Sequence, residues 1–217
     1  MTLEPFGYRD ELMRRYRDSV GRPVERTCEV GVWRGFFSQR ILDIFQSNLK
    51  VHYLVDLWAP QDSYADDCNT TPEKFEEAIS ATQKIVDDMG LSEKACFLKG
   101  FSTEVCSSID DASLDFCYID ARHDYLGCKD DIQAYWPKLK PGGLLAGHDY
   151  MTADECKKLL VKLNHFIPHQ DWSRCYDGSI NPSAVKGAVD EFVEANNLDL
   201  VIGTEENWPT WAVLKPD

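Results

Sequence analysis

Residues 27–38 read TCEVGVWRGFFS, and this stretch decides the fold. An apolar run typical of a buried strand leads into two glycines, Gly31 and Gly35, and a helical pattern then begins. Glycine lets the backbone turn sharply and approach a ligand closely, because it has no Cβ. The first N–H groups of the following helix can also face a ligand. The stretch therefore predicts a ligand-binding strand–turn–helix unit.

The two glycines do not follow the Gly-x-Gly-x-x-Gly pattern of dinucleotide-binding enzymes. Val32 and Trp33 fill the place where a middle glycine would make room for a pyrophosphate. A ligand without phosphates fits this turn better. An NAD-dependent oxidoreductase is for this reason only a distant alternative.

Asp56 closes the next apolar run, Tyr53-Leu-Val-Asp56, 21 residues after Gly35. An acid at this position can accept hydrogen bonds from both ribose hydroxyls of an adenosine. A helix cap or a solvent-facing acid is the alternative interpretation. Together with the glycine turn, Asp56 indicates an adenosine-type ligand.

Short apolar runs alternate with longer amphipathic segments along the whole chain, as in a parallel sheet with crossover helices. The segment 204–210 is too short to hold a crossover helix, so the two strands around it should pair antiparallel. We predict an α/β fold: a Rossmann-like, doubly wound, seven-stranded sheet, mostly parallel, with a C-terminal antiparallel hairpin. The expected strands are 27–32, 51–56, 95–98, 114–120, 143–147, 199–203 and 211–215.

No repeat or linker divides the sequence, so we expect a single domain over residues 1–217, with residues 1–26 as an N-terminal helical lead-in. Two polar and aromatic stretches, 58–71 and 150–180, follow the carboxyl ends of strands. Ligands bind at that edge of open α/β sheets, so these stretches are expected to be substrate-side lids. Ordinary surface insertions are the alternative. The expected helices are 8–20, 36–46, 72–89, 103–109, 125–139 and 183–196.

The composition limits partners and location. A net charge of −14 disfavours nucleic acid as a partner, and no apolar run is long enough for a membrane helix. The first residues lack the apolar core of a secretory signal, so a cytoplasmic location is expected, with all eight cysteines free. A small molecule or a glycan is the expected partner, and a homo-oligomer is compatible with the sequence.

Four polar side chains follow two further strands: Asp120 and His123 after one, His148 and Asp149 after the next. The carboxyl ends of adjacent parallel strands meet in one crevice, so these side chains should lie together. Carboxylates with imidazole can hold a divalent cation such as Mg²⁺ or Mn²⁺. Such a cation would activate an alcohol as a nucleophile, and a neighbouring imidazole could accept its proton.

These motifs together resemble those of class I S-adenosylmethionine-dependent methyltransferases. The motifs are Glu29-x-Gly31-x-x-x-Gly35, Asp56, and a block that runs from Tyr118-Ile-Asp120-Ala-Arg-His123-Asp-Tyr125 through Trp136-Pro-Lys-Leu-Lys-Pro-Gly-Gly143 to Gly147-His148-Asp149-Tyr150. More narrowly, they resemble the small stand-alone family that includes metal-dependent sugar O-methyltransferases of macrolide and glycan biosynthesis. The resemblance covers about residue 27 to the C-terminus.

The resemblance implies a role for each matching residue. His148 departs from the pattern, because the related enzymes commonly carry an acid there, and histidine lowers the preference for Mg²⁺. The implied cofactor-binding residues are Glu29 and Gly31 at the methionine end, Gly35 in the same turn, Asp56 at the ribose, Ser102 near the adenine, and Asp120. The implied metal ligands are Asp120, His148 and Asp149, and the implied catalytic residues are His123, as the general base, and Asp120.

The expected function is therefore methyl transfer from S-adenosylmethionine to a hydroxyl of a small molecule or glycan, most simply a sugar, assisted by a divalent metal. A metal-independent methyltransferase acting on an oxygen or nitrogen of a phenol or amine is the main alternative. A cofactor-binding scaffold without catalysis is the non-enzymatic alternative.

Overall fold

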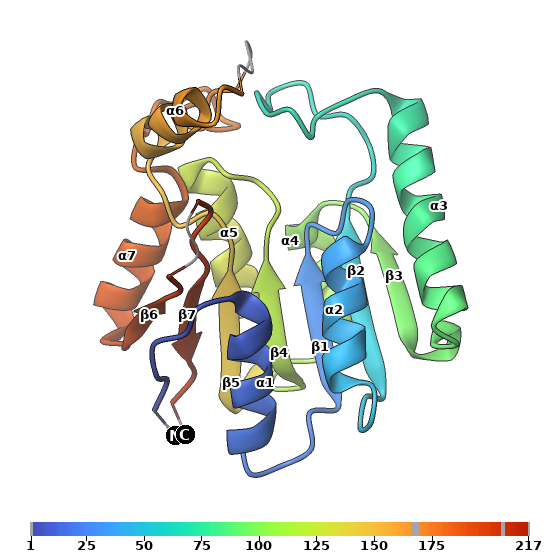
Figure 1. The fold of residues 1–217 in the computed structure, drawn as a ribbon. Coiled ribbons are helices and arrows are strands. Elements are labelled where there is room, and N and C mark those ends of the chain that lie inside the picture. Colours follow the sequence, from blue (N-terminus) through green and yellow to red (C-terminus); the bar gives the residue numbers. More distant parts are fainter. Residues whose placement is uncertain (1, 166–169, 205–206, 217) are drawn as a thin grey trace.

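A computed structural model describes residues 2–165, 170–204 and 207–216. Seven strands form one sheet in the order β3-β2-β1-β4-β5-β7-β6 (Figure 1). Strands β1 to β5 pair in parallel, and β7 runs antiparallel to both β5 and β6. The predicted sheet and its C-terminal hairpin are confirmed. The strands are β1 (Arg26–Val30), β2 (Val51–Asp56), β3 (Ala95–Lys99), β4 (Leu114–Ile119), β5 (Leu139–Gly147), β6 (Leu200–Ile202) and β7 (Trp211–Leu214).

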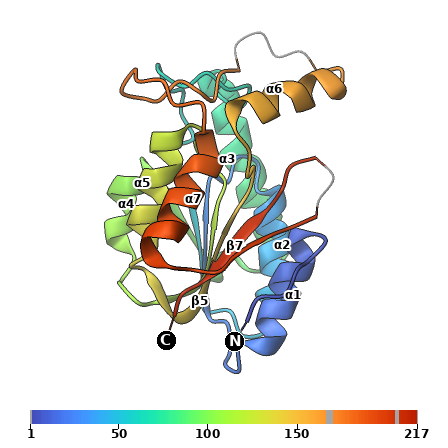
Figure 2. The same ribbon diagram turned by 90° about the vertical axis from the view of Figure 1, so that its left-hand side faces the viewer.

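Helices cover both faces of the sheet, as Figure 2 shows edge-on. One layer contains α1 (Arg9–Ser19), α2 (Phe36–Phe45) and α3 (Pro72–Asp88); the other contains α4 (Ser102–Val105), α5 (Tyr125–Tyr135) and α7 (Ala184–Asn196). Every residue of β4 is buried, as expected for a strand covered on both faces. No helix in the described ranges is long and apolar enough to cross a membrane.

The strand order reverses between β1 and β4, and this switch point places two strand ends side by side. Asp120 N donates to Val30 O at 2.7 Å, just beyond the last pairs of the two strands. Gly31 has a φ of +89°, and a Cβ there would lie 2.0 Å from Asp120 O. Only glycine therefore fits this contact, which opens a crevice at the carboxyl edge of the sheet.

The structure corrects the boundary between the predicted helix 125–139 and the predicted strand 143–147. α5 ends at Tyr135, and β5 already begins at Leu139, so Lys140-Pro-Gly-Gly143 lies inside the strand. The pairing of β5 with β4 shifts register at this point, between Leu114 and Phe116. A β-bulge tolerates glycine and proline inside a strand, which is why these residues did not end it.

The predicted lid 150–180 contains a helix that the sequence prediction lacked. α6 (Ala153–Lys162) lies above the carboxyl ends of the strands, opposite the segment that joins β2 to α3 (Figure 1). Its start is a capping box, in which the Thr152 hydroxyl accepts from Glu155 N and the Glu155 carboxylate accepts from Thr152 N. The Thr-x-x-Glu spacing was the sequence signal for this helix. Residues 166–169 of this stretch lie outside the described residues.

Candidate active site

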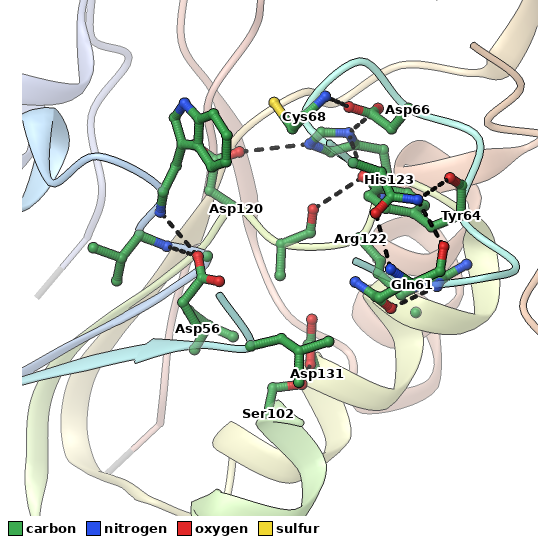
Figure 3. Close-up of a pocket in the computed structure, with 18 of the residues that line it drawn as sticks. Asp56, Gln61, Tyr64, Asp66, Cys68, Ser102, Asp120, Arg122, His123 and Asp131 are labelled. Carbon is green, nitrogen blue, oxygen red and sulfur yellow. Dashed lines mark hydrogen bonds and ion pairs between the residues drawn. The ribbon is translucent and has the colours of Figure 1, made fainter. Parts of the chain in front are cut away.

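A cavity of about 1040 Å³ opens at the carboxyl ends of β1, β2, β4 and β5. Part of its wall is shown in Figure 3, with Asp56 on one side, His123 on the other and Asp120 between them. The crevice predicted from the strand ends is therefore present. The predicted site residues that line it are Glu29, Gly31, Asp56, Ser102, Asp120, His123, His148 and Asp149.

Gly35 is the one predicted site residue that is not part of the cavity wall. It is the N-cap of α2, with a left-handed φ of +75°. A Cβ on Gly35 would lie 2.8 Å from the Thr82 side chain of α3. The structure thus places this glycine in the packing of α2 against α3, behind the turn.

Asp56 holds the glycine turn in place. Its Oδ2 accepts hydrogen bonds from Val32 N at 2.8 Å and Trp33 N at 2.9 Å, and its Oδ1 accepts one from Trp58 N at 2.7 Å. Burial raises the pKa of this carboxyl, and the backbone donors oppose that shift. A carboxylate has about four acceptor positions, so a ligand hydroxyl would share Asp56 with the backbone.

Two hydrogen-bonded polar residues, Ser102 and the buried Asp131, border the cavity beyond Asp56. Ser102 Oγ donates to Asp131 Oδ1, and Asp131 is only 3% exposed (Figure 3). Burial raises the pKa of Asp131 to about 7. Sequence reasoning missed Asp131. The signal was its helical spacing, because Asp131 lies one turn from each of the buried residues Cys128 and Tyr135 and so faces inward with them.

Glu29 lies in the floor of the same cavity, on β1. It is almost fully buried, and its carboxyl accepts a hydrogen bond from Ser38 Oγ of α2. Burial raises the pKa of Glu29 well above its ordinary value of 4.5.

The four polar residues that follow β4 and β5 converge as predicted. His123 Nε2 lies 3.1 Å from Asp149 Oδ2 and 3.7 Å from Asp120 Oδ1. His148 Nδ1 lies 3.3 Å from Asp149 Oδ1 and 3.8 Å from Asp120 Oδ2. Two carboxylates and two imidazoles thus share one corner of the cavity.

The same corner fits a divalent cation. Ligand atoms of Asp120, His123 and Asp149 all lie within 4.8 Å of one another. His123 Nε2 and Asp149 Oδ1 are buried, and neither has a hydrogen-bond partner among the described residues. Both atoms instead take part in the ion pairs given above, with Asp149 Oδ2 and His148 Nδ1, so the group is a charged cluster whose donor atoms suit a cation. His123 is the third member of this group, whereas the sequence prediction had given His148 as the third ligand.

The other ring nitrogen of His123 contacts Asp66, which sequence reasoning also missed. His123 Nδ1 lies 2.9 Å from Asp66 Oδ2, and the Tyr64 hydroxyl lies 3.0 Å from the same nitrogen. Burial alone would lower the pKa of His123, but the oxygens of Tyr64, Asp66 and the two other acids raise it well above 6.5. The opposite holds for Asp66: burial would raise the pKa of its carboxyl, but the nearby His123 lowers that pKa below its ordinary value of 3.8.

Aromatic side chains of the two predicted lids, together with Trp208, line the cavity. Trp172 packs against the His123 ring, with 4.6 Å between the ring centres, and Trp208 lies 6.1 Å from Trp172. Tyr64 and Tyr176 also line the cavity. Trp58 does not: it is 1% exposed, and its indole donates to Trp33 O at 3.0 Å. Trp58 is therefore a core residue beneath the glycine turn.

The sequence itself matches a family model described as a methyltransferase domain, over residues 28–150. This match spans more than half of the chain, and the chain belongs to this methyltransferase family. The family and the sheet topology together confirm the predicted class I S-adenosylmethionine-dependent methyltransferase. No curated protein sequence matches the chain.

Solved structures share the fold at low sequence identity. An O-methyltransferase from Bacillus cereus in complex with SAH has a TM-score of 0.60 and 13% identity, covering 99% of this chain and 83% of its own. The O-methyltransferase TomG from Streptomyces achromogenes, involved in tomaymycin synthesis and solved with SAM, has a TM-score of 0.57 and 13% identity, covering 95% and 79%. An rRNA methylase from Streptococcus thermophilus has a TM-score of 0.58 and 12% identity, covering 100% and 99%. Such likeness shows the fold alone, so the acceptor must be argued from the site.

Proposed function

We propose that this protein transfers the methyl group of S-adenosylmethionine to a hydroxyl of a small sugar-like acceptor, with a divalent cation at the transfer site. The observation that carries this proposal is the convergence of ligand atoms from Asp120, His123 and Asp149, all within 4.8 Å of one another in the wall of the cavity.

The residues that line the cavity favour one orientation of the cofactor. Its adenine lies toward Ser102 and Asp131, where an amino group can donate to the buried carboxyl. Its ribose lies at Asp56, and its methionine part extends over Glu29 and Gly31 toward Asp120. This direction supports transfer at the ends of β4 and β5, because the polar cluster lies beyond Asp120.

Asp120, His123 and Asp149 would hold the cation. When bound, a divalent cation lowers the pKa of a coordinated hydroxyl and orients its oxygen. Two carboxylates and one imidazole suit Mn²⁺ or Mg²⁺. Asp66 fixes the His123 ring, since it accepts from Nδ1–H and so turns Nε2 toward Asp149 and Asp120, where a bound cation would take the place of the Nε2 proton.

The sequence prediction made His148 a metal ligand and His123 the general base. The geometry favours the reverse, with His123 as ligand and His148 as base. His123 has Nδ1 on Asp66 and Nε2 in the group of metal-type ligands, so the ligand role suits it. His148 lines both the main cavity and a shallow hollow that Tyr8 and Trp208 also border. A proton taken up by His148 can therefore pass outward to solvent, which suits a general base.

The acceptor side favours a compact molecule with several hydroxyls. Trp172 and Trp208 offer flat apolar surfaces on which the C–H face of a sugar can stack. Asp67 and Asp130 add carboxylates that can accept hydrogen bonds from hydroxyls. The cavity accommodates the cofactor together with a small acceptor.

Metal binding and turnover test the proposal together. Titration with Mn²⁺, followed by electron paramagnetic resonance, should show one site in the wild type and a loss of it in Asp149→Asn. Asp199→Asn, an exposed acid outside the cavity, is the matched control and should bind as the wild type does.

Labelled cofactor with sugar nucleotides, glycans, phenols and amines should give transfer to a sugar hydroxyl that stops on chelation. Equal turnover after exhaustive chelation would contradict the metal, and transfer only to phenols or amines would contradict the acceptor class.

A further inference from the structure

We propose that Arg9 binds the α-carboxylate of the cofactor's methionine part, so that the N-terminal helix α1 supplies one wall of the cofactor site. This inference rests on the cofactor placement proposed above. It adds a specific binding residue from a part of the chain that lies outside the family match, which begins at residue 28.

Arg9 reaches the cavity from the first turn of α1. The helix runs antiparallel to the parallel strands, so this turn is the end of α1 nearest to their carboxyl edge (Figure 1). Arg9 lines the cavity together with Glu29, Gly31 and Asp120. These are the residues at which the proposed placement puts the methionine part.

Two aromatic residues hold the guanidinium in position. It lies 4.3 Å from the centre of the Phe37 ring, and Phe37 in turn packs on Tyr118 with 4.2 Å between ring centres. Arg9 Nη1 also donates to the Tyr118 hydroxyl at 3.4 Å. Phe37 and Tyr118 are buried, so the platform is rigid, and little side-chain entropy remains to be lost on binding.

The charges of the site call for a cation at this point. The methionine part carries one ammonium and one carboxylate, and the acids Asp120 and Asp149 line this part of the cavity. These acids suit the ammonium but repel the carboxylate. Arg9 Nη1 lies 3.9 Å from Asp120 Oδ2, so an ammonium beside Asp120 and a carboxylate on Arg9 would form an alternating array.

Three other arginines line the described part of the cavity, and they suit this role less well. Arg34 pairs with Glu77, and its side chain is 41% exposed. Arg122 is bound to Asp124 at 2.6 Å and to Gln61 at 2.9 Å, on the lid side. The side chain of Arg40 is 56% exposed and pairs with Asp10, whereas that of Arg9 is 24% exposed. Partial burial strengthens an ionic contact, which favours Arg9 as the carboxylate partner.

Calorimetry with two ligands tests the inference. S-adenosylhomocysteine carries the carboxylate, and its decarboxylated analogue keeps the amine and lacks only that group. Arg9→Ala and Arg9→Gln should lower the affinity for S-adenosylhomocysteine by about 10- to 100-fold and leave that for the analogue unchanged. Arg14→Ala, which removes another cation of α1 that does not line the cavity, should change neither affinity.

Two results would overturn the inference. An equal loss for both ligands would mean that Arg9 only supports the shape of the wall, and no loss for either would mean that it does not face the carboxylate. The placement itself is tested separately with Asp131→Leu, which should weaken both ligands because both contain adenine. If Asp131→Leu has no effect while Arg9→Ala acts on S-adenosylhomocysteine alone, the adenine position is wrong and the carboxylate assignment stands.

Discussion

Asp66 Oδ2 accepts a hydrogen bond from the indole of Trp172 at 2.8 Å, across 106 residues of sequence. The same oxygen contacts His123 Nδ1, so one carboxylate joins both lid segments to the polar cluster. A second link lies beside it, where Asp171 N donates to Ala65 O at 2.8 Å. The two predicted lids are therefore bonded to each other where they line the cavity.

Asp66→Asn should lower kcat by about 10- to 100-fold, because an amide no longer fixes the His123 ring as a carboxylate does. Steady-state kinetics should show this loss, while calorimetry should show almost unchanged affinity for S-adenosylhomocysteine. Asp62→Asn changes an exposed acid of the same segment and serves as the control. An equal loss in that variant would indicate a general disturbance of the lid.

Substitutions of the two histidines, His123 and His148, should have different effects. His123→Ala should abolish binding of Mn²⁺, whereas His148→Ala should keep it and lower kcat by about 10²- to 10⁴-fold through loss of the proton acceptor. Metal titration and single-turnover kinetics on both variants check this. The opposite pattern would restore the roles predicted from the sequence, with His148 as ligand and His123 as base.

Asp56→Ala should weaken both the fold and cofactor binding. The substitution removes the acceptor for Val32 N, Trp33 N and Trp58 N, so the free energy of unfolding should fall by at least about 1.5–3 kcal/mol. Affinity for S-adenosylhomocysteine should fall by about 10-fold or more as the turn loosens. Urea unfolding and calorimetry measure the two effects. Unchanged stability would show that the turn does not depend on this carboxylate.

Asp131 should make stability depend on pH near neutrality. Its pKa is raised to about 7 in the folded protein, from an ordinary value of 3.8. Between these values the folded state holds a proton that the unfolded state has released, so stability falls as pH rises, by up to about 1.4 kcal/mol per pH unit. The loss should level off above pH 7.

Asp131→Asn cannot titrate, so its stability relative to the wild type should increase from pH 5 to pH 7 and then stay constant. Urea unfolding at pH 5, 6, 7 and 8 measures the difference. Asp110→Asn, at an exposed position, should follow the wild type. A constant difference between Asp131→Asn and the wild type across this range would contradict the raised pKa.

The fold could be predicted because it depends on local patterns. Continuous apolar runs identified the seven strands, and the short connection before β7 predicted the antiparallel pairing with β6. Gly31 and the residues after β4 and β5 could be placed because parallel strand ends meet at one edge. The start of β5 was misplaced, since glycine and proline in a bulge resemble a turn in sequence.

The missed residues reach the cavity only through tertiary structure. Arg9 meets Tyr118 across 109 residues, and Asp66 meets His123 across 57. Neither lies at a strand end or in a motif, so no local pattern separates it from an ordinary surface charge. Trp58 was assigned to a lid by its position after β2, but its ring turns inward beneath Trp33, which composition cannot indicate.

The mutual attachment of the lids has a consequence for engineering this protein. In the proposed placement, the cofactor half of the cavity is built from the glycine turn and Asp56, whereas much of the acceptor half comes from two insertions that bond to each other through Asp66 and Trp172. A new acceptor range can therefore be introduced without altering the sheet. The two insertions must be exchanged as a pair, because a graft of either one alone leaves its bonding partner behind.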